Sequence, residues 1–296
     1  MTTSDSQTNT SPCLIVGIGV DPDDSAPLQA FFSTLPTECG LAFVLVTQWT
    51  GKDQTALIET IKTCTTLPVQ EVRDNQTVAV NRVYFAPPTT QLVFREGVLQ
   101  AKTEKEPATD LLFQSLAKEQ GEDAIGILLG RYESDAGLKA IADVGGMTMA
   151  LDSLGAQSDS SLNEGLMSGF IDHLLPPEDM PRELLSYARH LNALTVSGYR
   201  DSQSAQIAQH LDTICELLLD TTQTDFKHYK TSTLIRRIQH RLDVLQVNQV
   251  NRYVEKLRND TKERRTLFKK LLVGVTAFFR DEESLLCWRN KLSPVC

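Results

Sequence analysis

The first residues with chemical potential follow an apolar run near the start of the chain. Leu14–Val20 reads LIVGIGV and is followed by Asp21-Pro-Asp-Asp-Ser25. These glycines do not make a dinucleotide-binding loop, because Pro22 occupies the third glycine position and three aspartates would repel a pyrophosphate. The aspartates suit the positive end of a helix that begins near Pro27, with Ser25 as its N-cap. We therefore favour a capping role for Ser25 over a catalytic one.

A second group of reactive side chains is basic and lies in the last third of the chain. It consists of Lys227, Lys230, Arg236, Arg237, His240 and Arg241. Arg237 and Arg241 are four residues apart, so they share one helix face. Such a run is most often a solvated face, and its alternative partners are an acidic protein surface or nucleic acid. No aromatic stacking platform or recognition-helix signature accompanies the charges, so we expect no nucleic acid.

The net charge of −9 conceals two regions of opposite sign. The residues from Phe226 to Cys296 include 16 Lys or Arg and 7 Asp or Glu, a net charge of +9, which leaves −18 for the preceding residues. This division suggests two modules that face different partners or each other.

Composition narrows the class of protein. The chain is 41% hydrophobic and 23% charged, which excludes wholesale disorder, collagen and coiled coil. No apolar run reaches the roughly 18 residues of a membrane helix, and residues 1–12 lack the basic start and apolar core of a signal peptide. We therefore expect a cytoplasmic protein without membrane insertion. The six cysteines have neither zinc-ligand nor disulfide spacing, so we expect free thiols and no metal site.

The elements that must position these side chains form two groups. From 13 to 190, near-continuous apolar runs alternate with amphipathic helical patterns, which predicts an α/β fold with a doubly wound, mostly parallel sheet. Strands are expected at 14–20, 41–47, 83–87, 124–129 and 147–151, helices at 27–34, 53–64, 108–119 and 135–144, and a hairpin at 92–95 and 98–101. Asp21 then lies at the carboxyl end of a strand, where such sheets bind ligands. Beyond Ala205 the apolar spacing of three and four predicts a small all-α domain.

Ordered motifs point to a known family. In the first region these are GIG at 17–19, LAFVLVTQ at 41–48, VYFAPP at 83–88, AIGILLG at 124–130, GLKAI at 137–141, GGMT at 145–148, GFIDHLLPP at 169–177 and MP at 180–181. They resemble the CheB-type chemotaxis receptor methylesterase domain. FKHYKTSTLIRR at 226–237 and LVGVTAFFRD at 272–281 are similar to the N-terminal helical domain of the CheR-type receptor methyltransferase. The whole resembles the front end of a fused methylesterase/methyltransferase signalling protein.

The resemblance implies a catalytic triad whose positions are altered here. Family esterases use a serine nucleophile, a histidine base and an orienting aspartate. The serine position falls on Asp21, the histidine position falls on Trp49, and the acid matches Asp135, or else Glu133 or Ser134. A carboxylate forms no stable acyl-enzyme, and an indole has no acceptor for a proton. Loss of triad members costs about 10⁴–10⁶ in rate, so we expect no methylesterase activity. Another hydrolysis by Asp21 and Asp135 is the less favoured alternative.

For the helical region, the resemblance implies recognition of glutamate-rich receptor segments. The substrate-binding residues would be Lys230, Arg236, Arg237, His240 and Arg241, with chemoreceptor cytoplasmic domains or other acidic signalling proteins as partners. The acidic first region of this chain is an equally good partner. Thr276 and Arg280 match the positions that contact S-adenosylmethionine, where Arg280 would pair with the cofactor's carboxylate. A class I methyltransferase domain needs on the order of 150 further residues, so we expect half a site and no tight binding.

We therefore divide the chain into a flexible tail (1–12), a methylesterase-like α/β domain (13–190), a polar linker (191–205), a helical domain (206–284) and the start of a truncated methyltransferase domain (285–296). The favoured function is an inactive methylesterase-like scaffold joined to a substrate-recognition domain. The alternative is a fragment of an active protein-glutamate O-methyltransferase whose catalytic domain lies beyond residue 296. The 296 residues alone are expected to catalyse neither reaction.

Overall fold

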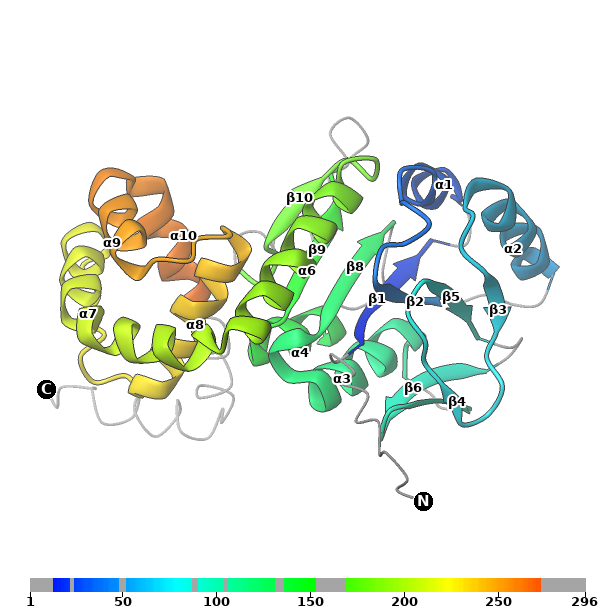
Figure 1. Cartoon of the computed structure of the whole chain (residues 1–296), viewed down its shortest axis with the longest axis horizontal. Coiled ribbons are helices and arrows are strands. Elements are labelled where there is room, and N and C mark those ends of the chain that lie inside the picture. Colours follow the sequence, from blue (N-terminus) through cyan, green and yellow to red (C-terminus); the bar gives the residue numbers. More distant parts are fainter. Residues whose placement is uncertain are drawn as a thin grey trace, which may run out of the picture.

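A computed structural model describes residues 13–21, 24–47, 52–86, 90–103, 106–130, 136–152 and 169–272. Their helices and strands form two modules that lie next to each other along the long axis of the molecule (Figure 1). The first module is α/β and the second is helical.

The α/β module is built on a seven-stranded parallel sheet with strand order β10-β9-β8-β1-β2-β5-β3. The strands are β1 (Leu14–Val20), β2 (Leu41–Val46), β3 (Val69–Glu71), β5 (Arg82–Phe85), β8 (Ile125–Leu129), β9 (Met147–Leu151) and β10 (His173–Leu175). This confirms the predicted parallel α/β fold. The short strands β3 and β10 at the sheet edges were not predicted, because three residues are too few to show a periodic pattern.

Helices cover both faces of this sheet. One face carries α1 (Ala26–Ser33), α2 (Lys52–Cys64) and α6 (Met180–Ser197), and the other carries α3 (Ala108–Gln120) and α4 (Ala136–Val144). Val16 and Ile18 of β1 point into the first core, whereas Ile15 points into the second. Because both faces are buried, the strand reads as a continuous apolar run instead of an alternating one.

A small antiparallel sheet lies beside α3. It contains β4 (Gln76–Thr77), β6 (Gln91–Arg95) and β7 (Val98–Lys102), and the short 3-10 helix η1 (Gly121–Asp123) follows α3. The predicted hairpin is confirmed: Glu96 and Gly97 form its turn, and both have positive φ angles, as tight hairpin turns favour.

At the start of α1, Ser25 does occupy the N-cap position, but its side chain does not bond the helix backbone. The backbone N–H of Ala26 donates to Asp24 Oδ1 at 3.0 Å, and Ser25 Oγ instead accepts from Gln29 Nε2 at 3.2 Å. The Asp24 carboxylate therefore satisfies the first backbone N–H of α1, and the N-cap serine makes no capping hydrogen bond.

The helical module contains α7 (Tyr199–Thr222), α8 (Thr231–Val244), α9 (Val250–Asn259) and α10 (Thr261–Leu272). They pack around a core of their own that includes Leu218, Phe226, Tyr253 and Leu257. The helical character predicted for this region is confirmed.

Residues 191–205, predicted as a polar linker, are helical. α6 continues to Ser197, Gly198 adopts a left-handed φ of 62°, and α7 begins at Tyr199. The stretch lacks strong apolar periodicity, yet Leu194 and Gln203 are buried in it. The modules are thus joined by a break between two helices, and Val244 of α8 packs into the same core as β1 and α6.

Gly137 in α4 lies against the backbone of α3. A β-carbon at Gly137 would lie 2.7 Å from Asp110 Cα, and the backbone N–H of Gly137 donates to Asp110 Oδ1 at 2.7 Å. Gly137→Ala improves helix propensity by about 1 kcal/mol. We nevertheless expect a loss of about 1–3 kcal/mol in the free energy of unfolding, because α3 must move. Urea unfolding monitored by circular dichroism measures the change in the free energy of unfolding. An increase in the variant would contradict the close approach of α4 to α3.

Candidate functional site

The carboxyl ends of β1 and β8 meet at one edge of the sheet. Val20 pairs with Leu129, so the residues that follow them, Asp21 and Gly130, are neighbours. Asp21 is buried, and its β-carbon lies against Gly130, whose φ is +146°. A side chain at Gly130 would collide with Asp21. The fold therefore holds a carboxylate at the edge where α/β sheets gather ligands, and a carboxylate there accepts hydrogen bonds or protons.

The other predicted positions at this edge, Trp49 and Asp135 with the alternatives Glu133 and Ser134, lie outside the described residues. Thr276 and Arg280, the positions assigned to S-adenosylmethionine, do so as well. The structure thus locates only Asp21 of this set. At the end of β2, Thr47 Oγ1 is buried and has no hydrogen-bond partner among the described residues.

The basic residues of α8 lie in different surroundings. Lys230 is exposed at the N-terminal end of the helix. Arg236 Nη2 donates to the backbone oxygen of Asp143 at 3.0 Å, and Arg237 donates to the backbone oxygen of Ala142 and pairs with the Asp143 carboxylate at 3.3 Å. Asp143 and Ala142 belong to α4, so two of the predicted substrate-binding arginines contact the α/β module.

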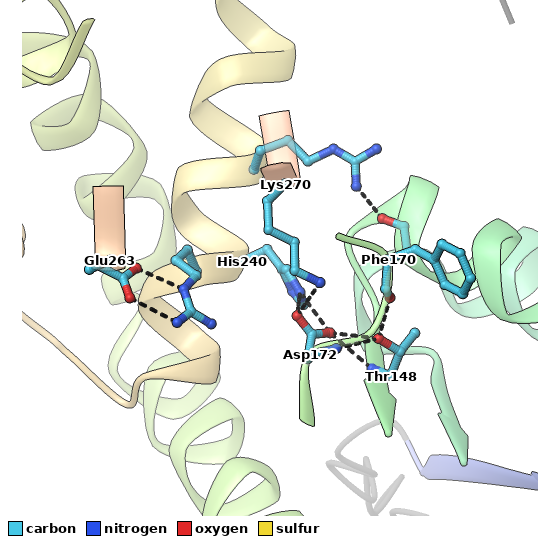
Figure 2. Close-up of polar contacts among 9 residues, drawn as sticks. Thr148, Phe170, Asp172, His240, Glu263 and Lys270 are labelled. Atoms are coloured by element: carbon cyan, nitrogen blue, oxygen red, sulfur yellow. Dashed lines mark hydrogen bonds and ion pairs between the residues drawn. The ribbon is translucent and has the colours of Figure 1, made fainter. Parts of the chain in front are cut away.

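Asp172, just before β10, is the centre of this seam between the modules. Its side chain is 0% exposed. From the helical module, Lys270 Nζ lies 2.6 Å from Oδ1 and His240 Nε2 lies 3.1 Å from the same oxygen. On the other side, the backbone nitrogen and Oγ1 of Thr148 lie 3.0 and 2.9 Å from Oδ2. Figure 2 shows His240 and Lys270 converging on Asp172 opposite Thr148.

The electrostatics of Asp172 favour its ionised form. Burial by itself raises the pKa of this carboxyl, but the charges and hydrogen bonds of Lys270 and His240 outweigh burial and hold the pKa well below 3.8. The α/β module therefore presents a buried anion to two side chains of the helical module.

A second ionic cluster joins the modules at the start of α7. Arg200 Nη2 lies 3.3 Å from Glu122 Oε2, and Arg200 Nη1 lies 3.3 Å from Asp123 Oδ1, both on η1. Arg200 Nη2 also lies 3.6 Å from Asp243 Oδ2 of α8, and His190 Nε2 of α6 lies 3.3 Å from Asp243 Oδ1. Arg200 therefore connects the acidic end of one module with a buried acid of the other.

Arg241 turns into the helical module. Its Nε and Nη2 donate to the two carboxylate oxygens of Glu263 at 2.7 and 2.8 Å, and Tyr253 OH lies 3.0 Å from Oε1. This bidentate pair already satisfies Arg241 inside the core, away from the arginines that face α4.

The sequence did not reveal Asp172, Lys270 or Glu263 as partners of the basic helix. Asp172 lies within a motif that carried the family resemblance, but it is 68 residues from His240. No local spacing indicates a contact at that separation. An acid within an apolar motif was the only available signal.

The described ranges provide no further chemical centre of the usual kinds. They contain no group of three or more His, Cys, Asp or Glu placed to hold a metal ion. Cys13, Cys39, Cys64 and Cys215 are free thiols. No helix within the same ranges is long and apolar enough to cross a membrane.

Asp172→Asn removes the anion and preserves its shape. Breaking a buried ion pair leaves Lys270 without a counter-ion, which costs about 3–5 kcal/mol. The folded-state pKa of Asp172 lies below the ordinary 3.8, so its stabilisation is complete above pH 3.8 and is lost as the pH falls through the folded-state value. We expect the stability difference from wild type to be constant from pH 7 to 5 and to shrink below 3.8 in urea titrations. A difference that vanishes between pH 7 and 5 would contradict this assignment.

Glu263→Gln tests the pair inside the helical module. It leaves the buried Arg241 without a counter-ion, and we expect a loss of about 3–5 kcal/mol in the free energy of unfolding. The double variant Arg241→Met/Glu263→Met should lose less than the single variant, because no lone charge remains buried. Thermal unfolding of both variants measures the difference. Equal losses would show that the ion pair is not what Glu263 contributes.

Comparison with known families agrees with both modules. The family model of the CheB methylesterase matches residues 16–184, and that of the CheR methyltransferase all-alpha domain matches residues 209–272. The solved CheB methylesterase catalytic domain of Thermotoga maritima superposes with a TM-score of 0.53 at 20% identity. It covers 59% of this chain and 98% of that domain, which supports the same fold.

Two curated relatives extend the comparison. A Rhodobacter capsulatus protein named "Uncharacterized 104.1 kDa protein in hypE 3′region" is 28% identical over 245 residues, which are 74% of this chain and 26% of the relative. The "Protein-glutamate methylesterase/protein-glutamine glutaminase 2" of Shewanella denitrificans is 26% identical over 59% of this chain and 52% of its own length. The chain thus spans a quarter to a half of these relatives. With more than half of its length matched, the chain belongs to the CheB methylesterase family, and an all-alpha domain of the CheR methyltransferase type is fused to its methylesterase domain.

Proposed function

We propose that this chain is a cytoplasmic chemotaxis signalling protein whose methylesterase-type module does not hydrolyse esters. The module serves as a scaffold for the helical module, which recognises acidic segments of chemoreceptors or of other signalling proteins. The observation that carries the first part is the buried carboxylate of Asp21 at the carboxyl end of β1, against Gly130.

The chemistry of a carboxylate at this position supports an inert module. Attack by Asp21 on a methyl ester forms a tetrahedral intermediate from which methoxide or the Asp21 carboxylate can leave. Methoxide is by far the poorer leaving group, so the intermediate returns to the ester. Trp49 offers an N–H donor and no proton acceptor, so it cannot act as the base that activates a water or an alcohol.

The charge of the helical module supports its recognition role. Lys227, Lys230, Arg252 and Arg265 are exposed cations on the loop before α8 and on α9 and α10. A surface of this sign attracts glutamate-rich segments and weakens at high salt. The family match in this region is to the all-alpha domain, and a cofactor-binding methyltransferase domain is not among the matches. S-adenosylmethionine would use Thr276 and Arg280, and we propose no tight binding by this chain alone.

Ester hydrolysis provides the direct test. Methanol release from a receptor fragment methylated on glutamate should not exceed the rate in buffer, because neither a nucleophilic alcohol nor a base is present at the two altered positions. Asp21→Asn should leave this rate unchanged, and an active methylesterase of the same family serves as the positive control. Release clearly above buffer that Asp21→Asn abolishes would overturn the proposal.

A further inference from the structure

The side chains best suited to bind an acidic partner are covered in this structure. Arg237, His240 and Lys270 are 3%, 4% and 3% exposed. Their positive or donor groups all face the α/β module, and only Lys230 of the expected substrate-binding set is exposed. A receptor segment therefore cannot reach this face of α8 and α10 while the modules are docked.

The surface that covers them has the chemistry of the expected partner. The α/β module contributes the carboxylates of Asp172 and Asp143 and the backbone oxygen of Ala142. These groups accept hydrogen bonds from the side chains that would bind glutamates of a receptor, and the two carboxylates form ion pairs with them. The module therefore occupies the site in the manner of a substrate.

The donors around Asp143 and Asp172 are not all satisfied. These two carboxylates face Arg236, Arg237, His240 and Lys270, whereas the other acids of the seam, Glu122 and Asp123, pair with Arg200. Arg236 Nε and His240 Nδ1 are buried and have no hydrogen-bond partner within the described part of the chain. Buried donors without partners favour any state that satisfies them. A segment with several carboxylates offers more acceptors than the docked module does.

We infer that the α/β module is a built-in competitor for the acidic partner of the helical module, and that Asp172 is the group that keeps the seam closed. This inference rests on the proposed recognition of acidic segments. An acidic segment binds the face formed by Arg237, His240 and Lys270 only when the seam opens. The packing of Val244 into the first core opposes opening, so the closed state predominates.

The chain has room to open at the junction of α6 and α7. Gly198 there has a left-handed φ, and no atom from another part of the described chain lies within 4 Å of the position that a β-carbon would take. We place the opening at this break, because it is the point at which the chain passes from α6 into the helical module. The apparent affinity for a partner that needs the open state falls in proportion to the open fraction, so a change that favours opening tightens binding.

Asp172→Asn in the full chain separates this inference from a purely structural role. The substitution weakens the competitor and leaves every cation of the helical module in place, so we expect at least tenfold tighter binding of a labelled glutamate-rich peptide by fluorescence anisotropy. Glu59→Gln, an equal charge change at an exposed position on α2, should leave the affinity unchanged. A peptide with glutamine in place of glutamate should bind weakly to all variants. Adding Arg237→Glu to Asp172→Asn should abolish the gain in affinity for the glutamate-rich peptide.

Hydrogen exchange of the α8 amides in the same variants reports opening independently. Asp172→Asn should accelerate it, and Asp143→Asn, at a carboxylate that is 40% exposed, should act in the same direction more weakly. Should Asp172→Asn not fold, Asp143→Asn carries the test. Tight peptide binding by wild type, equal to that of the variant, would overturn the masking and leave acidic recognition standing. Faster exchange in the variants without peptide binding would overturn the recognition of acidic segments. Exchange equal to that of wild type would show that the seam does not open, which would overturn the inference.

Discussion

A single buried carboxylate, Asp172, determines how the two modules fit together. An ionised group with no exposed surface is tolerated only when it is fully paired, and the sheet supplies half of its partners through Thr148. The other half, His240 and Lys270, comes from two helices of the second module. Without those helices the carboxylate would face water, and with them it is enclosed. The docking of α8 and α10 is therefore part of the electrostatics of the α/β module.

This dependence also explains which acids the basic side chains of α8 contact. Positive charge on α8 indicates affinity for acids, and the acids nearest to it belong to the same chain. Arg236 and Arg237 reach α4, His240 reaches Asp172, and Arg241 is already paired with Glu263 in its own module. The basic side chains of α8 thus contact α4, Asp172 and Glu263, although they form one cluster of positive charge in the sequence.

The functional edge of the sheet follows from a different constraint, which is close packing of helices on the strands. A β-carbon at Gly17 or Gly126 would collide with side chains of α3 or α4, and one at Gly137 would collide with α3 itself. These small residues let the helices and the sheet approach closely. The edge that they support holds the buried carboxylate of Asp21 against Gly130.

The sequence alone determined most of the longer elements and the two-module plan, because strand and helix periodicity are local properties. The strand LIVGIGV at β1, the hairpin turn at Glu96-Gly97 and the amphipathic helices α8 to α10 were all predictable in this way. The change from acidic to basic charge near Phe226 also marked the second module. The stretch 191–205, expected to be a polar linker, is helical, and a helix with few buried positions and a single break at Gly198 shows no strong period.

Only the tertiary structure decided which charges meet. Asp172 and His240 are 68 residues apart, and Arg237 and Asp143 are 94 apart, so no helical or strand spacing relates them. Their pairing depends on the directions of α8 and α10 relative to β10 and α4, which the packing of both cores sets together. Local patterns specify which side of an element is buried, whereas the partner on the other side is fixed by the whole fold.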